Sequence, residues 1–318
     1  MKERKCVLLL GGFGFIGTNL LKYIDNNFQD EFSVVVFDRF EKHPHDIHFN
    51  CVEKVYVGDF SDDTTIEFIF KNHSFDLVIH SISTTIPLSS KNARYDIETN
   101  LIPTVNLLNT MTQYGIKDII FISSGGAVYG NNINKTRHKE SDDLFPVSSY
   151  GIVKLTIEKY LIQYANIHQI RPLILRLSNP YGPYHFSVKQ GLCNVAIRSA
   201  VQNIPFYVWG NGETKKDYIY IDDFCDIFFQ LFFQKVNKQI LNIGSGDIYS
   251  VNTILKKVKN FIPKFEWKYS DASTFDVDNV ELEINNLKTH IGNYQFTPFD
   301  TGLQFTFDWI TKSKKINE

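Results

Sequence analysis

The chain has 318 residues, of which 43% are hydrophobic, and its 33 Lys and Arg against 35 Asp and Glu give a formal net charge of −2. This length suggests one large domain or two that share an interface, and the hydrophobic fraction excludes global disorder. The near-neutral charge gives no sign of a nucleic-acid surface. No run reaches the roughly eighteen apolar residues of a membrane-spanning helix. The four cysteines are widely separated, which predicts free thiols in a reducing compartment and no metal site. We therefore expect a soluble, cytoplasmic protein.

Apolar runs alternate with amphipathic segments through the first half of the chain. In chain order, we expect a strand at Cys6–Leu10, a helix at Gly14–Phe28, strands at Ser33–Phe37 and Val52–Val57, a helix at Asp62–Asn72, a strand at Phe75–His80, a helix at Ala93–Tyr114, a strand at Asp118–Ile122, a helix at Ser149–His168 and a strand at Pro172–Leu177. This alternation predicts an α/β fold with a doubly wound parallel sheet of the Rossmann type. We interpret residues 1–177 as a dinucleotide-binding domain and residues 178–318 as a smaller α/β substrate domain, some segments of which return to the first.

A glycine-rich segment joins the first expected strand to the first helix. Glycines occupy positions 11, 12, 14 and 17. Gly11 permits a tight turn, Gly14 lets a pyrophosphate approach the backbone, and Gly17 lets the helix pack close to the sheet. The N–H groups at the start of the helix, at Phe15 and Ile16, can then bind phosphate. The segment therefore predicts a dinucleotide-binding site.

Acidic residues follow the second and third strands. Asp38 lies 21 positions after Gly17, where a carboxylate accepts hydrogen bonds from the ribose of NAD and repels the 2′-phosphate of NADP. Arg39 beside it could accept that phosphate, so NADP stays as the less favoured alternative. Asp59 and Phe60 follow the third strand, where they either reach the adenine or form a simple turn. We expect NAD as the cofactor.

Tyr150 and Lys154 are candidates for proton transfer. They lie four residues apart at the start of an expected helix, so both face the same side. An ammonium group near a phenol favours the phenolate and lowers the phenol pKa from its reference of about 10. Tyr150 therefore becomes a candidate acid/base near neutral pH.

Several segments, in order from residue 7 to about residue 250, resemble the extended short-chain dehydrogenases/reductases. The resemblance is strongest to their NAD-dependent sugar-nucleotide epimerases and dehydratases, typified by UDP-glucose 4-epimerase. Besides the glycine loop and the Tyr150 to Lys154 segment, the matching segments are Asn100–Thr104, Phe121–Gly130, Arg176–Gly182, Lys216–Ile219 and Asn242–Gly246.

The resemblance implies specific catalytic roles. Tyr150 would take the proton from a sugar hydroxyl, usually at C4, while hydride passes to NAD. Lys154 would hold the nicotinamide ribose and tune Tyr150, and Ser124 would share the substrate hydroxyl. Gly125, however, occupies the usual position of the catalytic Ser or Thr, one residue after Ser124.

The resemblance also implies binding residues and an assembly. Asn100 would support the cofactor site, Asn179 would contact the nucleotide diphosphate, and Lys216 stands where the family often has Arg. The family often places another Arg near the C-terminus, but Ser270–Val277 contains none, which predicts a less basic diphosphate site. The helices near 93–114 and 149–169 commonly form a dimer contact in this family, so a homodimer is expected.

The expected function is that of an NAD-dependent epimerase of a nucleotide-diphosphate sugar, most often a UDP-hexose, that inverts C4 through a 4-keto intermediate. Gly126 and Ala127 stand where the 4,6-dehydratases carry acidic residues, which argues against dehydration. The alternative is an NAD(P)H-dependent reductase of a 4-keto-6-deoxy sugar nucleotide, and a non-catalytic NAD-binding protein is less favoured. His43, His45 and His48 are interpreted as part of a solvated loop and not as metal ligands.

Overall fold

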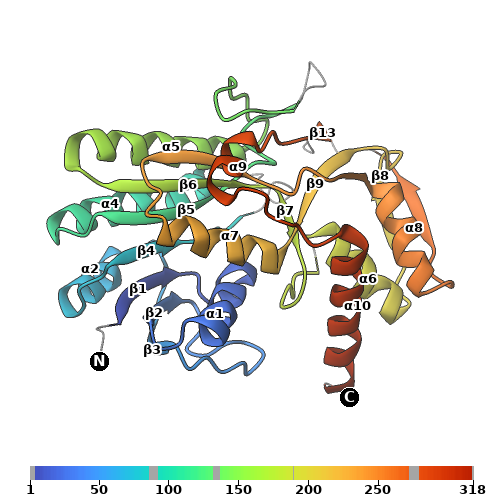
Figure 1. Cartoon of the computed structure of the whole chain (residues 1–318), viewed down its shortest axis with the longest axis horizontal. Helices are drawn as coiled ribbons and strands as arrows, with labels where there is room; N and C mark the ends of the chain where they lie inside the picture. Colours follow the sequence, from blue (N-terminus) through green and yellow to red (C-terminus); the bar gives the residue numbers. More distant parts are fainter. Residues whose placement is uncertain (1–3, 86–91, 132–136, 189, 272–278, 317–318) are drawn as a thin grey trace.

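The computed structural model describes residues 4–85, 92–131, 137–188, 190–271 and 279–316 (Figure 1). Its main sheet has seven strands in the spatial order β10, β6, β5, β4, β1, β2, β3. All neighbouring strands in this sheet are parallel. The bounds are β1 (Lys5–Leu10), β2 (Phe32–Asp38), β3 (Val52–Val57), β4 (Leu77–His80), β5 (Asp118–Ser124), β6 (Arg171–Leu177) and β10 (Gln239–Ile243). The predicted doubly wound sheet is therefore confirmed.

The central strands are continuous apolar runs because helices cover both faces of the sheet. Side chains along a strand alternate between the two faces. Leu8 pairs with Val35 and Leu9 with Val36. Leu9 and Val36 enter the core on one face, whereas Leu8 and Val35 enter the core on the other.

Two groups of helices cover the sheet. One face carries α1 (Phe15–Asn27), α7 (Ile221–Phe233) and α9 (Asn285–Ile291). The other carries α2 (Asp63–Asn72), α4 (Ile102–Gln113) and α5 (Ser149–His168). Helices α7 and α9 come from the second half of the sequence, so that half contributes to the layer that covers the main sheet as well as to the elements outside it.

The helix expected at 93–114 is interrupted. It consists of α3 (Ala93–Asp96), a π-helical turn at Ile97–Leu101 and α4. Pro103 follows the turn and has no N–H to donate to the helical ladder, so the regular hydrogen-bond pattern is lost there. Within the turn, the side-chain amide of Asn100 donates to the backbone oxygen of Asp96 at 3.2 Å.

The remaining elements gather on the other side of the molecule, at the right of Figure 1. They are β7 (Asn179–Tyr181), α6 (Leu192–Gln202), β8 (Phe206–Trp209), β9 (Lys215–Tyr220), β11 (Ile248–Ser250), α8 (Val251–Phe261), β12 (Trp267–Ser270), β13 (Asn279–Val280) and α10 (Phe299–Ile316). A third hydrophobic core holds α6, α8 and α10 together.

The strand order reverses between β1 and β4, because the chain builds outward from β1 in both directions. In open α/β sheets, ligands bind beyond the carboxyl ends of the strands at such a switch point. No helix in the described part of the chain is both long enough and apolar enough to cross a membrane.

Candidate active site

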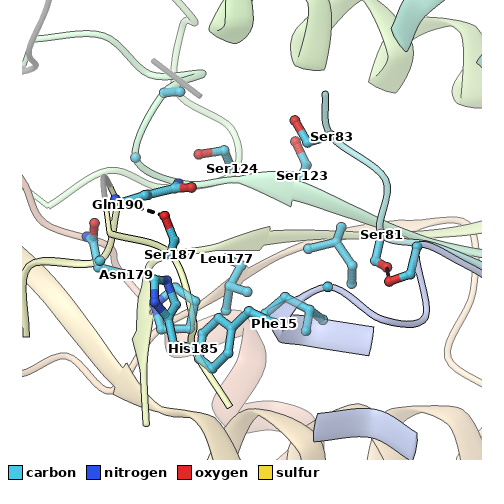
Figure 2. Close-up of a pocket in the computed structure, with 18 of the residues that line it drawn as sticks. Phe15, Ser81, Ser83, Ser123, Ser124, Leu177, Asn179, His185, Ser187 and Gln190 are labelled. Atoms are coloured by element: carbon cyan, nitrogen blue, oxygen red, sulfur yellow. Dashed lines mark hydrogen bonds between the residues drawn. The ribbon is translucent and has the colours of Figure 1, made fainter. Parts of the chain in front are cut away.

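A cavity of about 490 Å³ opens at the switch point. Several segments that are distant in sequence form its wall (Figure 2). The predicted site residues that line it are Gly11, Gly14, Phe15, Ile16, Gly17, Ser124, Tyr150, Lys154, Asn179 and Lys216. Ser81, Ser83 and the segment 184–187 also line it, although the sequence analysis did not single them out.

The glycine loop has the geometry of a phosphate cradle. A Cβ atom on Gly17 would lie 2.4 Å from the backbone oxygen of Gly11, so only glycine allows this helix start to pack. A Cβ on Gly14 would meet nothing nearer than 3.4 Å. Helix α1 has no acidic residue in its first turn, and Phe15 and Ile16, which carry its first N–H groups, line the cavity. These features fit the diphosphate of a dinucleotide.

Asp38 lies beside the glycine loop but outside the cavity wall. Its carboxylate accepts hydrogen bonds from the N–H groups of Phe13, at 2.9 Å, and of Arg39, at 2.7 Å. Burial raises the pKa of Asp38 from its ordinary value. Arg39 forms an ion pair with Asp59 at 3.2 Å. Both side chains of this pair are about half exposed, so it is a weak surface ion pair.

Phe60 and Asn100 also lie outside the cavity wall. Phe60 is buried and packs against Phe37 and His80. Asn100 acts one layer behind the cavity: its side-chain oxygen accepts the N–H of Thr84 at 2.9 Å, and its amide donates to the Thr84 hydroxyl at 2.6 Å. Asn100 therefore fixes the segment after β4, which carries Ser81 and Ser83 into the cavity.

Tyr150 and Lys154 lie on the first turns of α5, which Ser148 caps by accepting the N–H of Gly151. Lys154 Nζ donates to the backbone oxygen of Ile122 at 2.9 Å and lies 5.9 Å from the centre of the Tyr150 ring. Burial lowers the pKa of Lys154 to about 8. The pKa of Tyr150 is raised on balance, because burial outweighs the hydrogen bonding with Ser124 and Ser83 that lowers it. The structure thus brings the predicted acid/base, the ammonium group and the hydroxyl of Ser124 together.

Ser124, and not position 125, presents a side chain to the cavity. Ser124 ends β5 and lines the cavity, but Gly125 does not. A Cβ on Gly125 would lie 2.7 Å from a methyl group of Leu282 and 2.9 Å from the backbone oxygen of Arg176. A side chain at 125 would therefore enter packed structure, which explains why the hydroxyl comes from Ser124.

The segment 183–187 crosses the first turns of α1, and the sequence analysis did not identify it. The Asn19 amide donates to the backbone oxygen of Pro183 at 3.1 Å, and the His185 ring lies edge-on against Phe15 at 4.5 Å. Arg198 on α6 binds the carbonyl oxygens of three consecutive residues, at distances of 2.6 Å, 3.1 Å and 2.8 Å for positions 185, 186 and 187. The cavity wall beside the glycine loop is therefore held from two sides.

Three of the matching sequence segments, Arg176–Gly182, Lys216–Ile219 and Asn242–Gly246, meet at Asp217. Asp217 is fully buried, and its carboxylate accepts the N–H groups of Ser245 at 3.1 Å and Gly246 at 3.0 Å. A Cβ on Gly244 would lie 2.7 Å from that carboxylate. The backbone oxygen of Asp217 accepts the Asn179 amide at 2.9 Å. These bonds fix Asn179, and with it the neighbouring strand that carries Lys216, at the cavity wall.

A buried ion pair supports the floor of the site. Glu158 and Arg176 have side chains only 1% and 2% exposed, and their closest atoms are 2.8 Å apart. The Ser123 hydroxyl donates to Glu158 at 2.5 Å, and Arg176 donates to the Tyr129 hydroxyl at 2.9 Å. The pair therefore ties α5, which carries Tyr150, to the ends of β5 and β6.

One histidine of the predicted solvated loop is buried instead. His43 is 1% exposed, and its Nε2 lies 3.1 Å from the Thr18 hydroxyl. Its ring packs edge-on against Phe13 and Phe49, so the aromatic neighbours withdraw it from water. The prediction for this residue was wrong, because a polar local sequence does not show which side chain packs inward. The residues that the structure describes include no cluster of three or more side chains able to hold a metal ion.

Comparisons with known proteins agree with this geometry. The model of the "NAD dependent epimerase/dehydratase family" matches residues 7–244. The dTDP-4-dehydro-6-deoxyglucose reductase of Escherichia coli is 30% identical over 305 residues, covering 93% of this chain and 95% of the relative. The dTDP-glucose 4,6-dehydratase of the same organism is 26% identical, covering 97% of this chain and 94% of the relative.

Among solved structures, the UDP-glucose 4-epimerase of Thermotoga maritima with UDP-glucose has a TM-score of 0.89 and 27% identity. The similarity covers 97% of this chain and 99% of that one. The comparisons confirm the predicted fold and family. Because they include a reductase, a dehydratase and an epimerase, they define the class of enzyme more firmly than the reaction.

Proposed function

The chain belongs to the NAD dependent epimerase/dehydratase family, and from this premise we propose that it is an NAD-dependent epimerase that inverts C4 of a nucleotide-diphosphate sugar, with UDP-hexoses as the substrate class. The proposal rests on one observation. A single cavity is lined by a dinucleotide-type glycine loop and by Tyr150, Lys154 and Ser124. A cofactor and a sugar hydroxyl can therefore meet within one enclosed volume.

The residues of the cavity suit this chemistry. The glycine loop would hold the cofactor diphosphate, Asp38 the adenosine ribose and Lys154 the nicotinamide ribose. NAD supplies a hydride acceptor and donor when bound. Tyr150, as the phenolate, takes the proton of the C4 hydroxyl and returns it after the 4-keto sugar has turned in the site. Ser124 holds the reacting oxygen.

Lys154 favours the phenolate during this cycle. With its pKa lowered to about 8, its amine still carries a proton at neutral pH. A positive charge close to the phenol ring stabilises the negative charge that Tyr150 acquires. We infer that NAD is preferred over NADP, because the Asp38 carboxylate at the end of β2 would accept hydrogen bonds from the ribose of NAD and repel the 2′-phosphate of NADP.

Two other reactions of the family compete with this proposal. Dehydration needs acidic groups next to the catalytic hydroxyl, and positions 126 and 127 are Gly and Ala. Reduction of a 4-keto-6-deoxy sugar nucleotide is the second candidate, since it is supported by the 30% identity to the E. coli reductase. A reductase consumes one reduced cofactor for each product molecule, whereas an epimerase returns its NAD to the starting oxidation state in every cycle.

The test is turnover of a panel of UDP-, dTDP- and GDP-sugars with and without NADH or NADPH, followed by NMR. The panel includes 4-keto-6-deoxy sugars. Interconversion of C4 isomers without net consumption of cofactor supports the epimerase. Product that forms only with stoichiometric reduced cofactor supports the reductase. Tyr150→Phe should abolish turnover and still bind NAD; full activity in this variant would refute the role of Tyr150.

We also propose that the protein is a homodimer. Apolar side chains on α3, the π-helical turn, α4 and α5 are exposed to solvent, including Ile97, Ile102, Ile152 and Tyr160. Adjacent helices that expose apolar surface commonly form protein interfaces. Light scattering on the purified protein measures the mass directly, and a monomer at micromolar concentration would contradict the proposal.

A further inference from the structure

We propose that Ser83 is a further catalytic residue, whose hydroxyl donates a hydrogen bond to Tyr150 while Tyr150 is a phenolate. The inference rests on the acid/base role proposed above for Tyr150. No sequence motif points to Ser83. It follows β4, whereas Ser124 ends β5, so the two hydroxyls reach the phenol from different strands.

The geometry places Ser83 at the reacting group. Ser83, Ser124 and Tyr150 all line the cavity, and the hydroxyls of both serines lie close enough to the Tyr150 phenol to lower its pKa through hydrogen bonding. Figure 2 shows Ser83 and Ser124 on two separate segments of the cavity wall. Because Ser83 is itself accessible from the cavity, it contacts the same space as an incoming substrate.

The structure holds Ser83 in this position from both sides. The next residue, Thr84, is bound through its N–H and its hydroxyl to the buried side chain of Asn100, at 2.9 Å and 2.6 Å. The Ser83 hydroxyl itself donates to the backbone oxygen of Thr85 at 2.8 Å. The family position at Asn100 therefore also fixes a hydroxyl that points at the acid/base.

A count of protons shows how Ser83 responds to the charge of Tyr150. A serine hydroxyl has one proton and two lone pairs. While that proton is donated to the oxygen of Thr85, the Ser83 oxygen can accept the O–H of neutral Tyr150. When Tyr150 loses its proton, the phenolate competes with the neutral carbonyl, and hydrogen bonds to an ionised acceptor are about twice as strong. The Ser83 hydroxyl then turns toward Tyr150 and stabilises the phenolate.

Substrate binding makes this second donor useful. In the proposed reaction, Ser124 serves the sugar hydroxyl, so its hydrogen bond is shared between the sugar and Tyr150. Position 125, where the family usually has a hydroxyl, is glycine and faces Leu282. Ser83 is therefore the hydroxyl that can remain with Tyr150 throughout the reaction.

The test measures the ionisation of Tyr150 directly. Tyrosinate absorbance is followed against pH for the purified protein, and the curve of the matching Tyr150→Phe variant is subtracted so that only Tyr150 contributes. Ser83→Ala should move the midpoint up by about one pH unit, the effect of losing one hydrogen bond to a charged group. The low-pH limb of kcat should move in the same direction. Ser83→Thr, which keeps a hydroxyl, should restore the midpoint.

A matched control and a second variant keep the result interpretable. Ser81→Ala removes a hydroxyl from the same segment, but that hydroxyl donates to the backbone oxygen of Leu10 at 2.7 Å and not to Tyr150, so the midpoint should stay at the wild-type pH. Ser83→Cys, with a weak donor of similar size, should give an intermediate midpoint if Ser83→Ala does not fold. A wild-type midpoint in Ser83→Ala or Ser83→Cys would overturn the inference. Full turnover by Tyr150→Phe would instead overturn the proposed function, whatever the Ser83 variants show.

Discussion

Replacement of Glu158 by alanine tests how far the buried ion pair supports the site. Arg176 donates three hydrogen bonds to the Glu158 carboxylate, at 2.8 Å, 3.2 Å and 3.2 Å. The alanine variant would leave a guanidinium that is 2% exposed without its counter-charge. The Ser123 hydroxyl would lose its acceptor as well.

The expected cost is large. Removing one partner of a buried ion pair costs about 3–5 kcal/mol, because the remaining charge stays desolvated. That is a substantial part of a total free energy of unfolding of about 5–15 kcal/mol. There is a second effect on the site: Glu158 raises the pKa of Lys154, so its loss should lower that pKa further below about 8. The high-pH limb of activity should then move to lower pH.

The assay is urea denaturation followed by circular dichroism, together with the pH profile of turnover. The control is Glu98→Ala, which removes an exposed i,i+4 pair with Arg94 and should leave the midpoint unchanged. The double variant Glu158→Leu with Arg176→Met should recover most of the loss, since apolar replacement removes both buried charges. If Glu158→Ala unfolds at the same urea concentration as the control, the pair does not stabilise the fold and the reasoning fails.

Three other outcomes follow from the contacts described above. Gly17→Ala should weaken NAD binding by about tenfold, because the added Cβ would lie 2.4 Å from the Gly11 oxygen and displace the glycine loop. Calorimetry measures this affinity, and an unchanged value would contradict the role proposed for the glycine loop. Arg198→Ala removes the hydrogen bonds to three carbonyl groups of the segment 185–187. The KM of the sugar nucleotide should then rise by about tenfold, and NAD should dissociate faster. Wild-type values of KM and of the NAD dissociation rate would show that Arg198 is not needed to hold this segment. Burial lowers the pKa of His80 from 6.5 to about 3, so the folded protein keeps this side chain neutral. Between these two pH values the unfolded chain binds one more proton than the folded protein. The free energy of unfolding should therefore fall as the pH decreases through this range, by about 1.4 kcal/mol per pH unit. His80→Gln should show a shallower loss in urea titrations at pH 4 to 6, and an identical slope would refute the assignment.

Much of the fold could be predicted because its signals are local. Apolar strands covered on both faces are continuous runs, and the expected strand at Pro172–Leu177 is the buried part of β6. Sequence could not place the π-helical turn at Ile97–Leu101, because the Asn100 side chain bonds Asp96 within the turn and Thr84 outside it, and the second partner depends on tertiary packing. The contacts of Asp59 with Arg39 and of Phe60 with Phe37 also join residues at the ends of different strands, so the local sequence does not record them.

The sequence by itself predicted the glycine loop and the Tyr150 to Lys154 pair that the structure brings to one cavity. The glycine loop and the Tyr150 to Lys154 pair are short segments whose spacing follows from a strand, a turn and the period of a helix. Only the tertiary structure decided what surrounds them: Ser83 beside Tyr150, Arg198 behind the segment 185–187, and Glu158 paired with Arg176. These contacts join residues on different elements, so no periodicity in the sequence records them. They depend on the spatial order of the strands in the sheet. They also depend on which polar side chains are buried and therefore need a hydrogen-bond partner.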